Sequence, residues 1–202
     1  LLNIRGCSIT IPHKIDIIPL LDKTSENVRE MGACNTLYRD GEKICGENTD
    51  VIGFTAPLRK RSLPPETRVL VLGAGGVSRA AIAGLRRLGL ANITLTNRRK
   101  ERAEALCNEF GLLCAPWEER GDVPADLIIN TTPLGMTGAQ EHETPYPRAF
   151  QDNGIAYDLI YTPFQTRFLR DAAAAGWETV SGLDMFIGQG DAQFHLWTGH
   201  HL

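Results

Sequence analysis

The chain has 202 residues, a mass of 22.2 kDa and a net charge of −3, because 24 acidic residues outnumber 21 basic ones. This balance gives no general attraction for nucleic acid or an anionic membrane. With 43% apolar and 22% charged residues, the composition is that of a folded protein rather than a disordered one. No apolar run approaches the ~20 residues that span a bilayer.

The cysteines indicate a reducing compartment rather than a metal site. There are 5 of them, and none forms a CxxC pair. A zinc site would need clustered Cys and His, so no metal site is expected. Free thiols in a reducing cytoplasm are the simplest interpretation.

Residues 1–60 have the pattern of a small α/β domain. Alternating β-branched residues predict strands, and apolar residues at helical spacing predict helices. In chain order we predict a strand over 7–11, a helix over 22–31 capped by Thr24 or Ser25, strands over 33–38 and 43–45, and a helix over 50–60. Asp40-Gly41 forms the turn between the paired strands, and Pro64-Pro65 marks a domain boundary.

A different pattern follows the two prolines. Short apolar runs, typical of buried parallel strands, alternate with helical segments. Strands are predicted over 68–72, 92–96, 127–130 and 155–161, and helices over 77–88, 100–110 and 166–175. The predicted fold class is therefore α/β, with a Rossmann-type doubly wound parallel sheet over residues 61–181. A last helix over 185–197 lies in a segment, 182–202, that we expect to return to the first, discontinuous domain.

The turn between the strand at 68–72 and the helix at 77–88 is the strongest functional signal. It reads Gly73-Ala74-Gly75-Gly76-Val77, with Ser78 where a full GxGxxG pattern has its last glycine. Such glycines let the backbone turn tightly and approach a pyrophosphate, whose charge faces the helix N-terminus. The context of strand, turn and helix favours dinucleotide binding over a turn that serves packing alone.

The end of the next strand indicates which dinucleotide is bound. NAD-binding proteins usually carry Asp or Glu about 20 residues after the glycines, on the ribose hydroxyls. Here the segment 96–102 reads TNRRKER, without an acid at the strand end. Guanidinium groups bind a 2′-phosphate through forked, charge-assisted hydrogen bonds, whereas cations at a helix N-terminus otherwise oppose its dipole. The sequence therefore predicts NADP(H) rather than NAD.

Lys14 and Asp50 are candidates for proton transfer. A lysine and a carboxylate in one cleft can share proton transfer to a carbonyl or alcohol oxygen. Spacing alone leaves open the alternative that both are solvated surface groups.

A series of motifs, in order along nearly the whole chain, resembles the shikimate dehydrogenase family. Residues 7–14 (CSITIPHK) resemble its NVTxPxK motif, 32–37 (GACNTL) its GAxNTL and 48–50 its NTD. Residues 73–76 match GAGG, and 97–102 resemble NRTxxR. Residues 130–136 resemble NxTxxGM, 157–161 resemble YDxxY, and 182–185 with Gln189 resemble GxxMxxxQ.

The resemblance implies reversible, NADP-dependent reduction of 3-dehydroshikimate to shikimate, in the chorismate pathway to aromatic amino acids. It implies a small-molecule substrate, no nucleic acid or membrane partner, and a monomer or homodimer. Lys14 would be the catalytic lysine, paired with Asp50. The substrate would be bound by Thr10, Asn35, Asp50, Tyr161 and Gln189. The cofactor would be bound by Gly73, Ala74, Gly75, Gly76, Val77, Asn97, Arg98, Arg99, Arg102, Thr131, Leu159 and Gly182, with Glu26 approaching the nicotinamide from the other domain.

Two departures from the family pattern keep alternatives open. Arg99 stands where the family usually has Thr, and it either reinforces binding of the 2′-phosphate or points to water. The family's two serines for the substrate carboxylate precede the motif at Thr10, so we expect an N-terminal stretch before this chain. The alternatives are a quinate/shikimate dehydrogenase, a shikimate dehydrogenase-like enzyme acting on a related polyol acid, or a non-catalytic NADP-binding regulatory module. The presence of both Lys14 and Asp50 argues against the module.

Overall fold

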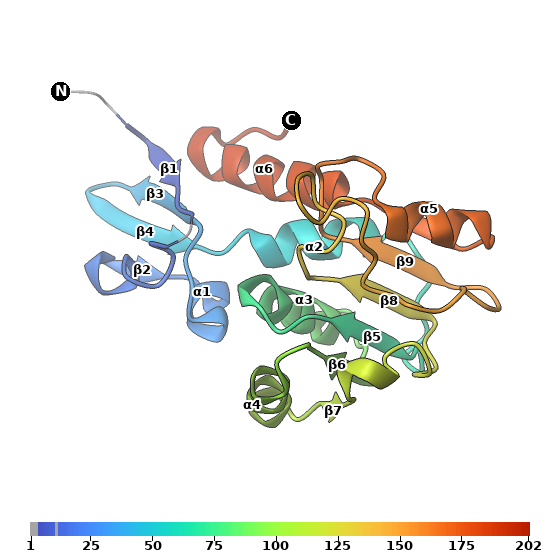
Figure 1. Cartoon of the computed structure of the whole chain (residues 1–202). Helices are drawn as coiled ribbons and strands as arrows, with labels where there is room; N and C mark the ends of the chain where they lie inside the picture. The colour runs from blue at the N-terminus through green and yellow to red at the C-terminus, as the bar shows by residue number, and fades with distance from the viewer. Residues whose placement is uncertain (1–3, 11) are drawn as a thin grey trace.

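Figure 1 shows the protein as a computed structural model, which describes residues 4–10 and 12–202. Two sheets lie side by side, and α2 and α6 run between them. The smaller sheet has 4 strands in the order β1-β3-β4-β2. Its strands are β1 (Gly6–Ser8), β2 (Lys23–Thr24), β3 (Thr36–Asp40) and β4 (Lys43–Glu47).

The larger sheet has 6 strands in the order β10-β9-β8-β5-β6-β7, and every neighbouring pair is parallel. Its strands are β5 (Val69–Leu72), β6 (Ile93–Thr96), β7 (Leu113–Cys114), β8 (Leu127–Asn130), β9 (Ile155–Asp158) and β10 (Glu178–Val180). The chain enters at β5, moves outward to β7, and returns to β8 on the other side of β5. The strand order therefore reverses between β5 and β8, and in such sheets ligands bind at the carboxyl ends of the strands at this reversal.

Helices cover both faces of the larger sheet. The α-helices are α1 (Glu26–Met31), α2 (Asp50–Leu58), α3 (Gly76–Arg87), α4 (Lys100–Phe110), α5 (Arg167–Ala174) and α6 (Gly182–Thr198). Short 3₁₀ helices are η1 (Ile18–Leu20) and η2 (Trp117–Glu119). None of the helices in the described ranges is long and apolar enough to cross a membrane.

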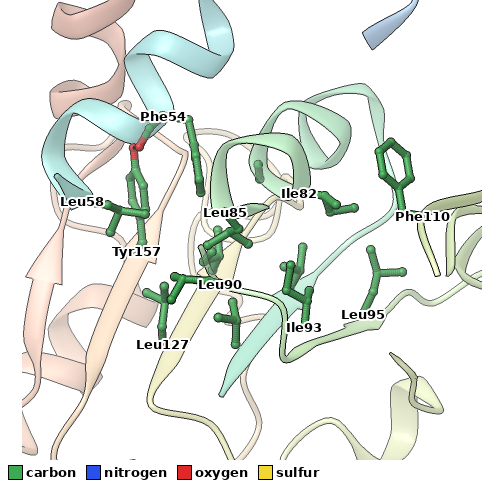
Figure 2. Packing of buried hydrophobic residues seen from close by; sticks show 14 of the residues in the cluster. Phe54, Leu58, Ile82, Leu85, Leu90, Ile93, Leu95, Phe110, Leu127 and Tyr157 are labelled. Carbon is green, nitrogen blue, oxygen red and sulfur yellow. The ribbon is translucent and has the colours of Figure 1, made fainter. Parts of the chain in front are cut away.

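Alternation along β5 explains why the larger sheet needs cover on both faces. Val69 and Val71 belong to one apolar cluster, with residues of α2, α3 and α4, while Leu70 and Leu72 belong to a second one, with residues of α5. Successive strand residues point to opposite faces, so a strand that is apolar throughout is buried on both. Figure 2 shows part of the first cluster, in which the ring of Phe54 from α2 stacks on that of Tyr157 from β9. The helix that follows the small sheet is thus anchored in the core of the large one.

Glycines let α2 and α6 pack at backbone distance. A Cβ atom at Gly53 would lie 2.5 Å from the Met185 carbonyl oxygen and 2.7 Å from the Gln189 nitrogen. On α6, Gly188 faces the same contact, since its Cβ would lie 3.1 Å from the Gly53 Cα. Close packing of these two helices places residues at the start of α2 beside residues of α6.

The predicted parallel sheet is confirmed, and its central elements agree within a residue or two with the ranges predicted for them. Several predicted boundaries are wrong. The first strand ends at Ser8 rather than residue 11, which lies outside the described residues. The predicted helix over 22–31 begins only after Ser25, whose hydroxyl accepts the Val28 N–H, because Lys23–Thr24 pairs with β4 instead.

Two further boundaries differ near the end of the chain. The strand predicted over 155–161 ends at Asp158, whose carboxylate accepts the Ile160 N–H and so turns the backbone out of the sheet. The last helix begins at Gly182 rather than 185, because Ser181 and Asp184 form a capping box at its start. The edge strands β7 and β10 were not predicted. The boundary predicted at Pro64-Pro65 falls in the link between α2 and β5 and stays a prediction.

Candidate active site

Lys14 and Asp50 meet, although they lie 36 positions apart in the chain. The Lys14 Nζ atom lies 2.8 Å from Asp50 Oδ2. Asp50 is the first residue of α2, where a carboxylate is favoured by the helix dipole. The Lys14 side chain is 28% exposed and that of Asp50 15%, so the pair is accessible to a ligand but largely shielded from water. This pairing is what proton transfer at a substrate oxygen requires.

Asn35, the residue just before β3, holds the pair in place. Its Nδ2 group donates to Asp50 Oδ1 at 2.8 Å and lies 3.3 Å from Gln189 Oε1. Its Oδ1 atom accepts the Thr49 N–H at 2.8 Å and the Thr36 hydroxyl at 2.7 Å. Because Asn35 is buried and both ends of its amide are bonded, three distant segments of the chain are fixed relative to one another.

The pair lines a cleft between the two sheets. This cleft has a volume of about 610 Å³, and Lys14, Asn48 and Asp50 form one wall. The opposite wall is the start of α3, with Gly76 and Arg79. The proton-transfer pair and the predicted pyrophosphate-binding turn therefore face the same space.

Two predicted substrate residues lie outside this cluster. Thr10 is exposed, and its carbonyl oxygen accepts the His13 N–H. Tyr161 is 54% exposed and stacks on Phe186 of α6, with the ring centroids 5.0 Å apart. Glu26 is the first residue of α1 and is exposed. The structure does not bring these side chains into contact with Lys14 or Asp50.

The glycine-rich turn has the geometry that a phosphate needs. Gly73 has φ +113°, and a Cβ there would lie 2.5 Å from the Thr131 hydroxyl. At Gly75 and Gly76, by contrast, a Cβ would meet nothing within 4 Å, so the backbone is open to a ligand at the start of α3. The buried Ser78 supports the turn, since its hydroxyl accepts the Gly75 N–H at 3.0 Å and bonds the Thr131 hydroxyl at 2.7 Å.

The arginines at the carboxyl end of β6 lie next to the glycine-rich turn. Asn97 joins them to the turn, because its Oδ1 accepts the Ala74 N–H at 3.2 Å. Arg98 lines a cavity of about 330 Å³ on one side and one of about 150 Å³ on the other. Among the described residues, no ion pair involves Arg98, Arg99 or Arg102, and all three are exposed. They fit an anion that comes from solution.

The remaining predicted cofactor residues lie at the carboxyl ends of β8 and β9. Thr131 follows β8, and the Leu159 N–H donates to the Asn130 carbonyl at 3.0 Å. Gly182 starts α6 against the same loop, where a Cβ would lie 2.5 Å from the Leu159 carbonyl oxygen. With Val77 in the first turn of α3, these residues form a continuous edge from the glycine turn to the cleft.

A buried carboxylate that the sequence analysis did not single out supports this edge. Asp158 accepts hydrogen bonds from the Thr166 hydroxyl at 2.6 Å, from Asn130 Nδ2 at 3.0 Å and from the Ile160 N–H at 3.0 Å. Burial raises the pKa of Asp158 to about 6, and the three hydrogen bonds oppose that shift. The only sequence signal was its place in the YDxxY pattern, where its function could not be distinguished from that of the tyrosines.

Fold and site together define a two-lobed protein of the dinucleotide-binding oxidoreductase class. Family models match residues 1–37 (shikimate dehydrogenase substrate binding domain) and 58–119 (shikimate/quinate 5-dehydrogenase). A shikimate dehydrogenase (NADP(+)) of Pelobacter propionicus is 56% identical over all of this chain and 74% of its own length. The chain belongs to the shikimate dehydrogenase family.

Solved structures agree with this assignment. A shikimate 5-dehydrogenase from Thermus thermophilus, in complex with NADP(H) and shikimate, is 39% identical, with a TM-score of 0.86 over 98% of this chain and 75% of that one. A quinate dehydrogenase from Corynebacterium glutamicum, in complex with NAD, is 31% identical, with a TM-score of 0.86 over 98% of this chain and 74% of that one. The family thus includes members named for either substrate.

Proposed function

We propose that this protein catalyses the reversible, NADP-dependent reduction of 3-dehydroshikimate to shikimate. One observation carries the proposal: the Lys14–Asp50 pair, fixed by Asn35, faces the open glycine turn at the start of α3 across one cleft. The names of the relatives described above support the same substrate and cofactor.

The chain's own residues supply a proton and orientation. When bound, the nicotinamide cofactor supplies or accepts the hydride. In the reduction, Lys14 gives its Nζ proton to the substrate oxygen as the carbonyl becomes an alcohol, and it regains a proton from solvent. Asp50 holds the ammonium group in position and can accept a hydrogen bond from a neighbouring hydroxyl.

The polar groups around the pair suit a ring that carries several hydroxyls. Asn35 and Gln189 offer amide donors and acceptors within the same cluster. A site built to bond hydroxyl groups discriminates against an analogue that lacks one, because its own polar groups are then left unpaired. Thr10 and Tyr161 would join this set when a substrate is bound.

The cofactor end favours NADP. Backbone N–H groups at the start of α3 suit the pyrophosphate, and Arg98, Arg99 and Arg102 suit a 2′-phosphate. No acid stands at the end of β6 to bond the ribose hydroxyls of NAD. The five free thiols are consistent with a cytoplasmic location, which we also propose. Whether the protein is a monomer or a homodimer stays a prediction.

A spectrophotometric assay tests the proposal. The gene product is incubated with shikimate or quinate and with NADP or NAD, and formation of the reduced cofactor is followed. We expect turnover with shikimate and NADP. Turnover with quinate at comparable kcat/KM would instead assign a quinate/shikimate dehydrogenase, and comparable kcat/KM with NAD would contradict the role of the arginines.

A Lys14 variant separates catalysis from binding. Lys14→Ala should remove turnover and leave the Kd for NADPH nearly unchanged, because Lys14 belongs to the proton-transfer pair and not to the glycine turn. Lys23→Ala is the matched control, since Lys23 of the edge strand β2 pairs with the exposed Asp40 and neither residue lines the cleft. An equal loss of NADPH affinity and of rate in Lys14→Ala would refute the role given to Lys14. Tight NADPH binding without turnover of either acid by the unmodified protein would favour a regulatory module.

A further inference from the structure

Two cysteines outside the active site lie close together near Asn97 and Arg98, at the end of β6. Cys107 is buried in the last turns of α4, and Cys114 is exposed on the edge strand β7. The Cys107 thiol lies 3.5 Å from the Leu113 carbonyl oxygen, and the peptide bond joins that carbonyl directly to Cys114. The Cys107 thiol thus lies one peptide unit from Cys114, and closing a disulfide requires their Cα atoms to come within ~4.4–6.8 Å of each other.

The side chain of Cys114 is turned towards the same helix. It lines the cavity of about 330 Å³ together with Ala103 and Glu104 of α4. Ala103 is one helical turn before Cys107 and is buried on the same face. Burial, and after it the neighbouring Cys114 thiol, raises the pKa of Cys107 to about 12.

We propose that Cys107 and Cys114 form a peroxide-sensitive dithiol, which closes to an intramolecular disulfide beside the cofactor's adenosine end. The exposed Cys114 is the thiol that a peroxide reaches first. It takes one oxygen atom and becomes a sulfenic acid, and the peroxide leaves as water. The Cys107 sulfur then attacks Cys114, the S–S bond forms, and the sulfenic hydroxyl leaves with the Cys107 proton as a second water.

The position of the pair gives the disulfide a consequence for cofactor binding, a step that rests on the proposed function. Pro116 and Trp117 follow Cys114 closely and line the cavity with Asn97 and Arg98. Drawing Cys114 towards α4 moves this wall of the cavity. We therefore expect oxidation to weaken the binding of NADPH several-fold.

Mass spectrometry tests the disulfide directly. The reduced protein is treated with hydrogen peroxide, alkylated and digested with trypsin. The tryptic peptide 103–120 contains both thiols and no other cysteine, so we expect it to lose the mass of two hydrogen atoms and to escape alkylation. Cys114→Ser should abolish this change. Cys7→Ser should retain it, because Cys7 is also exposed but belongs to β1 in the other lobe.

Two results would overturn the proposal. One is stable addition of oxygen to Cys114 while Cys107 remains available for alkylation, and the other is a link to a cysteine outside the peptide. An equal Kd for NADPH in the reduced and the linked protein would refute the effect on the cofactor. If the reduced protein itself fails to bind NADPH, the proposed function has failed, whereas the disulfide is judged by the mass alone.

Discussion

A single methyl group at Gly53 tests whether the close packing of α2 on α6 positions the active site. In Gly53→Ala, the new Cβ would lie 2.5 Å from the Met185 carbonyl oxygen and 2.7 Å from the Gln189 nitrogen. Ordinary contacts of a Cβ atom start near 3.4 Å. The two helices must therefore move apart by about 1 Å at this point, since both clashing atoms belong to backbone and cannot rotate away.

The energy of this change has two opposing parts. Overpacking a close contact costs typically about 1–3 kcal/mol. Replacing Gly by Ala within a helix returns about 1 kcal/mol. The variant should thus be destabilised by up to about 2 kcal/mol, which lowers the Tm by about 2–4 °C per kcal/mol for a chain of this size. Because Gln189 is displaced, its 3.3 Å contact with Asn35 is lost as well, and the KM for shikimate should rise by roughly two- to tenfold.

Gly190→Ala is the matched control for this experiment. Gly190 lies on the same helix, α6, but a Cβ there would meet nothing within 4 Å. This variant should keep the KM and gain about 1 kcal/mol from helix propensity alone. Thermal unfolding and shikimate kinetics of both variants decide the matter. If Gly53→Ala were as stable as Gly190→Ala with an unchanged KM, close helix packing would not be what holds Gln189 in the site.

Three further predictions concern the cofactor edge and its support. Arg98→Ala should raise the Kd for NADPH by about ten- to a hundredfold, because a charge-assisted hydrogen bond is lost, and should leave the Kd for NADH unchanged. Equal losses of affinity for both cofactors, measured by fluorescence titration, would exclude a contact with the 2′-phosphate. Ser78→Ala should raise the KM for NADPH and lower the unfolding free energy by about 1 kcal/mol, because the Gly75 N–H loses its side-chain acceptor and the Thr131 hydroxyl keeps only its bond to the Leu72 carbonyl oxygen. Urea unfolding and steady-state kinetics measure the two effects. The pKa of Asp158 is about 6 in the folded protein and about 4 in the unfolded chain, so folding favours its protonated form. The contribution of Asp158 to stability is therefore largest at low pH and declines as the pH rises through about 6. When the pH falls from about 8 to about 5, protonation of Asp158 should raise the unfolding free energy of the unmodified protein by about 1 kcal/mol relative to that of Asp158→Asn. The same pH dependence of the unfolding free energy in both proteins, measured by urea unfolding, would contradict this expectation.

The sequence was most informative where structure depends on near neighbours. The glycine turn at 73–76 and the strand and helix beside it could be predicted, because a buried parallel strand, a tight turn and a helix start leave marks within a few residues. Strand β2 could not be predicted, because Lys23–Thr24 has no strand pattern of its own and is ordered only by pairing with Cys45–Gly46. Edge strand β7 is short and exposed, so it lacks the apolar run that marked its neighbours.

In the candidate site, too, some features could be predicted from the sequence and others could not. Lys14 and Asp50 were chosen by their residue types and by the family resemblance, but no spacing rule could place their side chains 2.8 Å apart. Their meeting depends on Asn35, and the meeting of Asn35 with Gln189 depends on α6 returning across the molecule to α2. Such contacts are set by the packing of distant elements, which single-chain patterns do not encode. The exposed position of Tyr161, stacked on Phe186, belongs to this group too.

Asn35 shows why an amide, and not a carboxylate, stands at the centre of this site. Its Oδ1 accepts from Thr49 and Thr36, so its Nδ2 must be the group that faces Asp50. An aspartate at this position would have no N–H to donate to Asp50. It would also place a second negative charge beside Asp50, and the repulsion would disfavour the ionised form of both carboxylates. The uncharged amide leaves Lys14 as the cation that balances Asp50. The single negative charge of Asp50 therefore holds the lysine that we assign to proton transfer, while the amide fixes the direction from which it does so.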